Sequence, residues 1–165
     1  MKKLYAGIDP GFSGAVAMYR EDIDTWKVMN CPKTIPEISD IVMIMGEVIK
    51  NGNFDPVIAI ERVWAQPNNA VRSAFKFGTN YGAWIAALSF ADIPYIEVLP
   101  SKWQKEHKLP KDKPSRKREL RDKAAKLVNQ VMDEQKIKVT LKNADAIMIC
   151  SWLKNGGNND ESNGK

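Results

Sequence analysis

The chain has 165 residues, of which 44% are hydrophobic and 27% charged, and a net charge of +5. These values are ordinary for one soluble globular domain with a hydrophobic core. No apolar run approaches the roughly 18 residues of a membrane span, and the apolar stretch after Met1 stops at Asp9, too short for a secretion signal. We therefore expect a cytoplasmic protein without membrane contact. Cys31 and Cys150 lack metal-ligand spacing and are expected to be reduced thiols in or near the core.

Apolar periodicity predicts strands followed by alternating helices and strands. In chain order, the first half predicts strands at residues 3–8, 14–19 and 25–30, a helix at 36–50 and a strand at 56–61. The second half predicts a helix at 71–91, a strand at 95–99, a short helix at 101–107, a long helix from residue 115 and a last helix at 144–154. Short connections indicate that the first three strands form an antiparallel meander.

These elements predict an α/β fold, with a mixed five-stranded sheet flanked by helices on both faces. Residues 1–154 are expected to form one domain, and the polar residues 155–165 a disordered tail. Two expectations concern single helices. Gly78 and Gly82 share one face of the helix at 71–91, so this helix can approach a neighbour closely. Asn143 is expected to cap the last helix with its side chain.

The positive charge is concentrated in one segment. Residues 102–126 contain eleven Lys or Arg and four Asp or Glu, a local net charge of +7, so the rest of the chain carries −2. Such an asymmetry is typical of a protein that binds a polyanion on one side, although a solvated helix face has the same pattern. His107, the only histidine, lies in this segment and is expected to face solvent or phosphate rather than to act as a general base.

Three carboxylates stand at the ends of apolar elements. Asp9 ends the first strand, Glu61 ends the strand at 56–61, and Asp145 opens the last helix. Side chains at neighbouring parallel strand ends converge on one crevice. Each residue also has an ordinary structural explanation, which is a turn for Asp9, a salt bridge for Glu61 and a helix-end contact for Asp145. Taken together, three hard oxygen donors without a His or Cys cluster favour Mg²⁺ or Mn²⁺, which support phosphodiester hydrolysis.

Five motifs follow one another along the chain, at residues 7–11 with 13–17, 58–64, 73–78 with 81–82, 100–105 with 112–113, and 144–147. In this order they resemble the motifs of RuvC-like Holliday-junction resolvases, and the third and fourth resemble the phage branch of that family. The resemblance covers nearly the whole chain up to about residue 154. It implies an RNase H-like fold, a homodimer, and paired nicks placed across a four-way DNA junction.

The same resemblance implies roles for individual residues. Asp9, Glu61 and Asp145 correspond to the ligands of Mg²⁺, for which Mn²⁺ can substitute, and no small-molecule cofactor is expected. Lys113 corresponds to the basic residue near the scissile phosphate, with Lys105 as the second candidate for this role. Trp64 corresponds to an aromatic side chain that stacks on an unpaired base, with an ordinary core position as the alternative. The residues expected to bind branched DNA are Trp64, Lys102, Lys105, Lys111, Arg116, Lys117 and Arg118. A phage-encoded chain would act in the host cytoplasm.

The sequence departs from the family in one place. A fourth carboxylate is expected one turn before Asp145, where this chain has Leu141, Lys142 and Asn143. A lysine cannot bind a cation, so either three carboxylates suffice, or another acid takes part, or the chain has weakened cleavage. Asn143 differs from aspartate by one amide and stands as a position where an acid could have been replaced.

Other functions were compared with this interpretation. A junction-binding protein with the same fold and without cleavage is compatible with the missing carboxylate, and metal-dependent nicking separates it from a nuclease. The segment at 7–11 also resembles the start of actin-like and sugar-kinase ATPases, but those need a second phosphate loop and a much longer chain. Among nucleases, cutting of forks and flaps is the nearest rival to strict four-way resolution.

Overall fold

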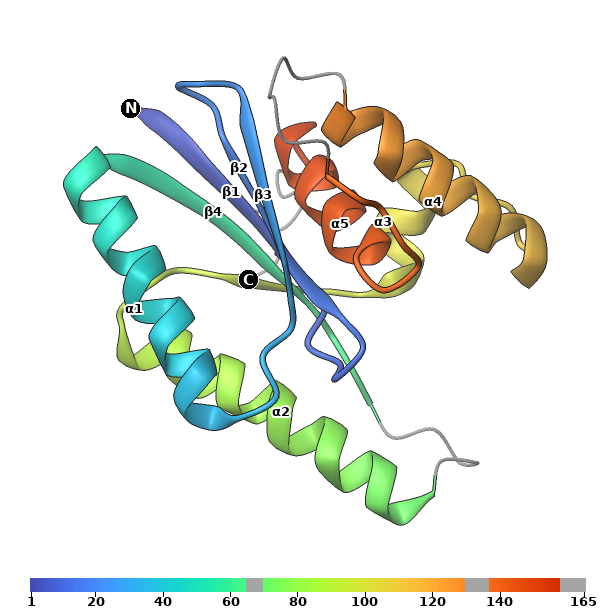
Figure 1. The fold of residues 1–165 in the computed structure, drawn as a ribbon, viewed down its shortest axis with the longest axis horizontal. Helices are drawn as coiled ribbons and strands as arrows, with labels where there is room; N and C mark the ends of the chain where they lie inside the picture. The colour runs from blue at the N-terminus through green and yellow to red at the C-terminus, as the bar shows by residue number, and fades with distance from the viewer. Residues whose placement is uncertain (65–69, 130–136, 158–165) are drawn as a thin grey trace, which may run out of the picture.

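The computed structural model describes residues 1–64, 70–129 and 137–157, and a mixed five-stranded sheet forms its centre (Figure 1). The strands are β1 (Lys2–Ile8), β2 (Ala15–Arg20), β3 (Thr25–Asn30), β4 (Phe54–Glu61) and β5 (Ile96–Val98). Their spatial order is β3-β2-β1-β4-β5, so β1 is the central strand. The first three strands form the predicted antiparallel meander, whereas β4 runs parallel to β1 and β5. The predicted mixed sheet is therefore confirmed.

Helices lie on both faces of this sheet, as predicted (Figure 1). In the described residues they are α1 (Ile35–Gly52), α2 (Val71–Phe90), α3 (Pro100–Glu106), α4 (Lys113–Asn129) and α5 (Ala144–Lys154). The helices α1 and α2 cover one face, and α5 lies on the other face, with α3 and α4 packed against it. The α/β fold class is confirmed. Within the described ranges, no helix is long and apolar enough to cross a bilayer.

Alternation along the strands builds two hydrophobic cores. Leu4, Ala6 and Ile8 of β1 point into the core beneath α1 and α2, because successive strand residues face opposite sides. The helical residues buried in this core are Ile38, Val42, Met45, Trp84 and Leu88. On the other face, α5 is buried on almost all sides because it lies between the sheet and α4. Cys31 and Cys150 are free and buried, one in each core.

The N-termini of α4 and α5 differ from the sequence prediction, α4 in its first residue and α5 in its capping. α4 begins at Lys113, two residues early, because the Asp112 carboxylate accepts a hydrogen bond from the Ser115 amide (3.0 Å) and caps the helix. Asn143 makes no capping hydrogen bond, so that prediction is wrong. Its backbone is helical rather than extended (φ −112°, ψ −6°), so its side chain turns back toward the preceding residues. There it accepts from the Thr140 amide (2.8 Å) and donates to the Lys138 carbonyl (3.1 Å).

Within the described part of the chain, no neighbouring helix approaches α2 at Gly78 and Gly82. A Cβ atom at either glycine would meet no heavy atom within 4 Å in the described part of the chain. The buried face of α2 carries Asn80, Trp84 and Leu88, and a residue two positions from Asn80 lies on the opposite side of a helix. The two glycines therefore lie on an open surface of α2.

The predicted domain boundary at residue 154 remains a prediction, although the ordered chain continues past it. The Gly157 amide donates to the Trp152 carbonyl (3.0 Å), and Gly157 is buried against the Trp152 ring. Residues 155–157 thus pack onto the end of α5. The rest of the predicted tail, residues 158–165, lies outside the described residues.

The contact between β1 and α5 generates a stability prediction. A Cβ on Gly7 would lie 2.3 Å from the Ala146 carbonyl oxygen and 2.5 Å from the Cys150 amide nitrogen. We predict that Gly7→Ala lowers the free energy of unfolding by about 3 kcal/mol, because α5 must shift away from the sheet. Gly46→Ala is the matched control. Gly46 lies inside α1, and its added Cβ would make only an ordinary 3.7 Å contact with Ile93. Because alanine favours a helix over glycine, Gly46→Ala should raise stability by about 1 kcal/mol. Urea unfolding of both variants checks this, and equal stabilities would contradict it.

Candidate functional site

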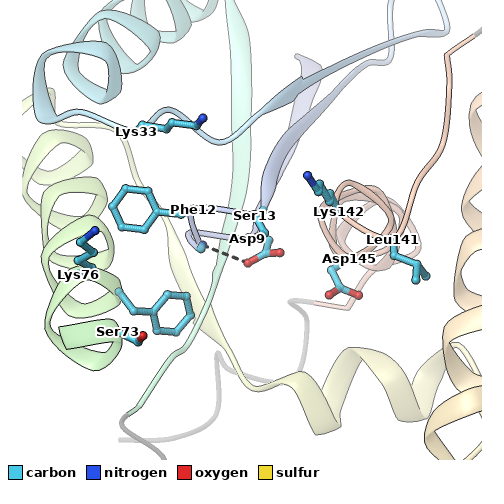
Figure 2. A pocket seen from close by; sticks show the side chains of 12 residues that line it. Asp9, Phe12, Ser13, Lys33, Ser73, Lys76, Leu141, Lys142 and Asp145 are labelled. Carbon is cyan, nitrogen blue, oxygen red and sulfur yellow. Dashed lines mark hydrogen bonds between the residues drawn. The ribbon is translucent and has the colours of Figure 1, made fainter. Parts of the chain in front are cut away.

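The three predicted carboxylates come from the central part of the fold. Asp9 directly follows β1, and Glu61 is the last residue of β4. Because β1 and β4 are parallel, with Ile8 opposite Ile60, the two carboxylates lie at the same edge of the sheet. Asp145 is in the first turn of α5, which packs on β1. Figure 2 shows the Asp9 and Asp145 side chains on the same side of the sheet edge.

A tight turn fixes Asp9. Its Oδ1 accepts a hydrogen bond from the Gly11 amide (3.2 Å), and its own amide donates to the Ala15 carbonyl (2.9 Å). A Cβ at Gly14 would lie 2.2 Å from the Asp9 carbonyl oxygen, so this close approach requires glycine. The turn that separates β1 from β2 therefore holds the Asp9 carboxylate against the backbone.

Glu61 is held by a residue that the sequence analysis did not assign to the site. The Trp103 Nε1–H donates to Glu61 Oε1 over 3.0 Å. Trp103 is fully buried in α3, so it presents this donor from a rigid position. In the sequence, only the presence of a tryptophan inside a short basic helix pointed to Trp103. Periodicity cannot predict that its ring N–H donates a hydrogen bond to Glu61.

Burial raises the pKa of all three carboxyl groups, and the charges of neighbouring carboxylates raise the pKa of Glu61 and Asp145 further. Burial is the main cause for Glu61, whose pKa rises to about 8, and the charges of Asp9 and Asp145 raise it further. Burial and then Asp9 raise the pKa of Asp145 to about 7. Burial raises the pKa of Asp9 to about 6, against a lowering effect of the Gly11 hydrogen bond. Asp9 is the strongest charge acting on each of the other two, so it is the electrostatic centre of the group.

The donor set fits a hard divalent cation. Carboxylate oxygens are the preferred ligands of Mg²⁺ and Mn²⁺, and a bound cation would relieve the repulsion that raises these pKa values. In the described residues no three His, Cys, Asp or Glu side chains are close enough together to hold one ion. For Asp9, Glu61 and Asp145 to bind one cation together, their side chains would therefore have to move closer to one another.

A cavity of about 930 Å³ opens in front of Asp9 and Asp145. Its floor is the turn from Gly11 to Gly14, and its walls come from α2 and from the turn before α5. Figure 2 shows three lysines around it, Lys33, Lys76 and Lys142, none of which the sequence analysis assigned to the site. Glu61 is not among the residues that line this cavity.

The predicted basic residues do not all lie at the carboxylates. Lys113 is exposed at the start of α4 and does not line the cavity. Arg116, one turn later, lowers the pKa of Asp145, so its charge reaches the carboxylates. Lys102 is half-buried, with its ammonium 5.6 Å from the centre of the Trp152 ring. The exposed basic residues of the predicted DNA-binding set are Lys105, Lys111, Lys117 and Arg118.

The structure shows where the side chains of Trp64 and His107 lie. Trp64 is 51% exposed just beyond β4, so the core alternative is excluded and its ring is accessible. His107 does not face solvent or phosphate as expected. Its Nε2 is 2.8 Å from the Met148 carbonyl, and Lys123 donates to the His107 carbonyl (2.6 Å). His107 therefore joins α3, α4 and α5.

The place of the expected fourth carboxylate is now defined. Lys142 lines the cavity, together with Leu141. The Asn143 side chain lies in the turn before α5, where its amide donates a hydrogen bond to the Lys138 carbonyl. An aspartate could not donate this hydrogen bond. The Asn143 side chain thus has a local structural role in the turn before α5.

The sequence matches no protein-family model and no curated protein. Similar folds occur among solved structures. Thermus thermophilus RuvC in complex with a Holliday junction substrate has a TM-score of 0.58 and 19% identity, over 94% of this chain and 97% of that one. The fold is RuvC-like. A second Thermus thermophilus RuvC structure has a TM-score of 0.53 and 18% identity, over 93% of this chain and 97% of that one. The yeast mitochondrial Holliday junction resolvase has a TM-score of 0.50 and 16% identity, over 96% of this chain and 81% of that one.

The raised pKa values predict how stability depends on pH without added metal. The folded carboxyls keep protons that the unfolded chain loses near the ordinary values of 3.8 and 4.5. Folding stability should therefore fall as the pH rises from about 4 through the folded pKa values of about 6 to 8. Asp145→Asn removes one charge, so the variant should be more stable than the parent at about pH 8 and show a smaller decline. Urea unfolding in EDTA measures this, and an identical pH dependence of the variant and the parent would contradict the raised pKa of Asp145.

Proposed function

We propose that this protein is a metal-dependent endonuclease that nicks four-way DNA junctions, and other branched DNA, by phosphodiester hydrolysis. The observation that carries the proposal is the group of half-buried carboxylates, Asp9, Glu61 and Asp145, at the edge of a RuvC-like sheet, where burial raises the pKa of all three and the charge of Asp9 raises that of the other two further. A buried group of like charges is stabilised by a bound cation. The Thermus thermophilus RuvC complex supports branched DNA as the substrate class.

Asp9, Glu61 and Asp145 would hold Mg²⁺, with Mn²⁺ as a substitute. Such an ion supplies a nucleophile by lowering the pKa of bound water and stabilises charge on the leaving oxygen. The chain's own contribution is orientation. The Gly11 amide and the Trp103 Nε1–H are neutral donors that fix two of the carboxylates without satisfying their charge.

The basic segment would bind the phosphate backbone of the junction. We propose Lys113 as the basic residue near the scissile phosphate and Arg116 as a second cation at the carboxylates, since Arg116 lowers the pKa of Asp145. The remaining proposed phosphate contacts are Lys102, Lys105, Lys111, Lys117 and Arg118. Trp64, with its exposed ring, would stack on an unpaired base at the junction centre.

A junction-binding protein without cleavage is the second candidate. Lys142 lines the cavity where a fourth carboxylate is expected, and the three carboxylates are not positioned to share one ion. Both observations favour weakened cleavage. We propose the nuclease as the first candidate because the repulsion among three half-buried carboxylates has no compensating function in a protein that only binds DNA.

The motifs at residues 73–78 and 100–105 support the phage branch of this family, and a phage-encoded chain would act in the host cytoplasm. Residues 73–78 form the start of α2, and residues 100–105 form most of α3. These two helices lie on opposite faces of the sheet.

Asp9→Asn provides the direct test. We predict that it abolishes nicking of an end-labelled four-way junction in Mg²⁺ or Mn²⁺ while junction binding changes less than about threefold, because it removes a metal ligand and no phosphate contact. Asp40→Asn, exposed on α1 far along the chain from the site, is the matched control and should nick like the parent. EDTA should stop nicking by both the parent and the control. A fork and a linear duplex, assayed in parallel, define the selectivity.

Each outcome of this assay separates the candidates. Metal-dependent, paired nicks in the junction by the parent, and none by Asp9→Asn, support the nuclease and show that three carboxylates suffice. Tight junction binding without nicking by the parent identifies the junction-binding protein. Nicking by Asp9→Asn at the parent's rate would overturn the site assignment.

We also propose a homodimer, formed through the open face of α2. This face carries Gly78 and Gly82 together with exposed apolar side chains, Val71 (87%), Phe75 (75%) and Phe90 (95%). Small residues allow two helix backbones to approach closely, and exposed aromatic side chains gain from burial in an interface. No other role for the two glycines arises from the described part of the chain.

The dimer is tested by Gly82→Glu. A buried, unpaired carboxylate at the centre of a helix–helix contact should convert the dimer to a monomer at micromolar concentration. Met43→Glu, which also places an acid on an exposed helix surface, is the control on α1 and should stay dimeric. Sedimentation velocity distinguishes the two states. A monomeric parent would rule out the dimer, and a dimeric Gly82→Glu variant would exclude this face.

A further inference from the structure

Three lysines from separate elements surround the cavity in front of the carboxylates. Lys33 follows β3, Lys76 is on α2, and Lys142 is in the turn before α5. All three are exposed. Figure 2 shows Lys33 and Lys76 across the cavity from α5, whereas Lys142 lies beside α5 with its side chain directed toward Lys33 rather than toward Asp145. The cavity therefore has carboxylates at its base and ammonium groups around its rim.

These lysines do not neutralise the carboxylates. The cation that lowers the pKa of Asp145 is Arg116, and the group that lowers the pKa of Asp9 is the Gly11 amide. Within the described ranges, no ion pair within 4.0 Å joins Lys33, Lys76 or Lys142 to an acid. Lys33 helps to lower the pKa of Glu37, but the two side chains form no ion pair within 4.0 Å in the described residues. The positive charge of the rim is thus available to a ligand.

The backbone under two of these lysines is firmly held. The Cys31 amide donates to the Gly14 carbonyl (2.9 Å), and the buried Asn80 side chain donates to the Pro32 carbonyl (3.1 Å). The amide of Lys33 itself donates to Glu37 (2.9 Å) in the capping box of α1. On the other side, Asn143 clamps the turn that carries Lys142. A fixed backbone lowers the entropy cost of ordering the lysines around a ligand.

Aromatic side chains lie between the lysines. Phe12, at the tip of the turn after Asp9, is 40% exposed and lines the cavity. Phe77 of α2 packs against Gly11, where an added Cβ would lie 3.0 Å from its ring. Cationic side chains interleaved with accessible aromatic rings are the combination that binds single nucleic acid strands, with lysines on phosphates and rings on bases or sugars.

We propose that Lys33, Lys76 and Lys142, with Phe12, form a phosphate-binding rim that holds one nucleic acid strand on the side of the carboxylates away from α3 and α4. This inference rests on the proposed function and names the path of the strand through the site. With the α3–α4 segment on one side and the rim on the other, the strand has cations on both sides of the scissile phosphate. Lys142 then has a function of its own at the position of the expected acid.

The test uses the full chain and a fluorescent oligothymidylate in EDTA, so that binding is measured without cleavage. The variants are Lys33→Gln with Lys142→Gln, and Lys76→Gln alone. The matched control is Lys27→Gln with Lys50→Gln, two exposed lysines on β3 and α1 that do not line this cavity. Both double variants lower the net charge by the same two units. Thermal unfolding verifies that each variant is folded.

The readout is the slope of log affinity against log salt concentration, whose magnitude is about 0.7 for each phosphate of a single strand that the protein neutralises. We expect this magnitude to fall by about 1.4 in the Lys33/Lys142 double variant and about 0.7 in Lys76→Gln, with no change in the control. A double variant whose slope equals that of the control would overturn the rim. Inorganic phosphate that competes with the oligonucleotide at matched ionic strength would instead identify a site for free phosphate, and would also overturn it.

The rim and the proposed function can fail separately. If the parent nicks junctions and the slope of the double variant is unchanged, the nuclease stands and the rim is wrong. If the slope falls as expected but the parent neither nicks nor prefers four-way junctions, the rim stands and the nuclease proposal is wrong.

Discussion

The close approach of α5 to β1 at Gly7 is the contact on which the rest of the structure depends. The backbone of the helix rests directly on the strand because glycine leaves no side chain between them. Gly7 is two residues before Asp9, and Ala146, which it contacts, is one residue after Asp145. This single contact therefore brings Asp9 and Asp145 together, although they are far apart in the sequence. Because α3 and α4 pack against α5, the same contact carries the basic segment to this edge of the sheet.

Bringing these carboxylates together opposes folding, because burial raises the pKa of all three and the charge of Asp9 raises the pKa of Glu61 and Asp145 further. The two neutral donors at the site, the Gly11 amide and the Trp103 ring N–H, orient oxygens without cancelling the charge. The rigid supports around them, a glycine turn and a buried tryptophan, keep Asp9 and Glu61 from moving apart to relieve the repulsion. Together, they favour a cation as the partner that stabilises the site.

The sequence predicted the parts of this arrangement that local patterns determine. Asp9 and Glu61 follow apolar runs, and parallel strand ends meet at one edge, so their proximity followed from periodicity. The contacts it could not predict depend on tertiary structure. Trp103 reaches Glu61 only because α3 packs beside β4. Asn143 turns its side chain away from the helix because the residues before it form a turn. Gly78 and Gly82 face outward because Trp84 sets the buried side of α2.

The lysine at position 142 illustrates how a single residue changes meaning once its surroundings are known. In the sequence it is a missing acid, one turn before Asp145. In the fold, its side chain points toward Lys33, away from the carboxylate of Asp145 (Figure 2). An acid with that orientation would add negative charge to the rim of the cavity without joining the three carboxylates. It would also repel any phosphate that approached them. A lysine here is therefore consistent with a three-carboxylate site, because it supplies attraction for the substrate where an acid would oppose it.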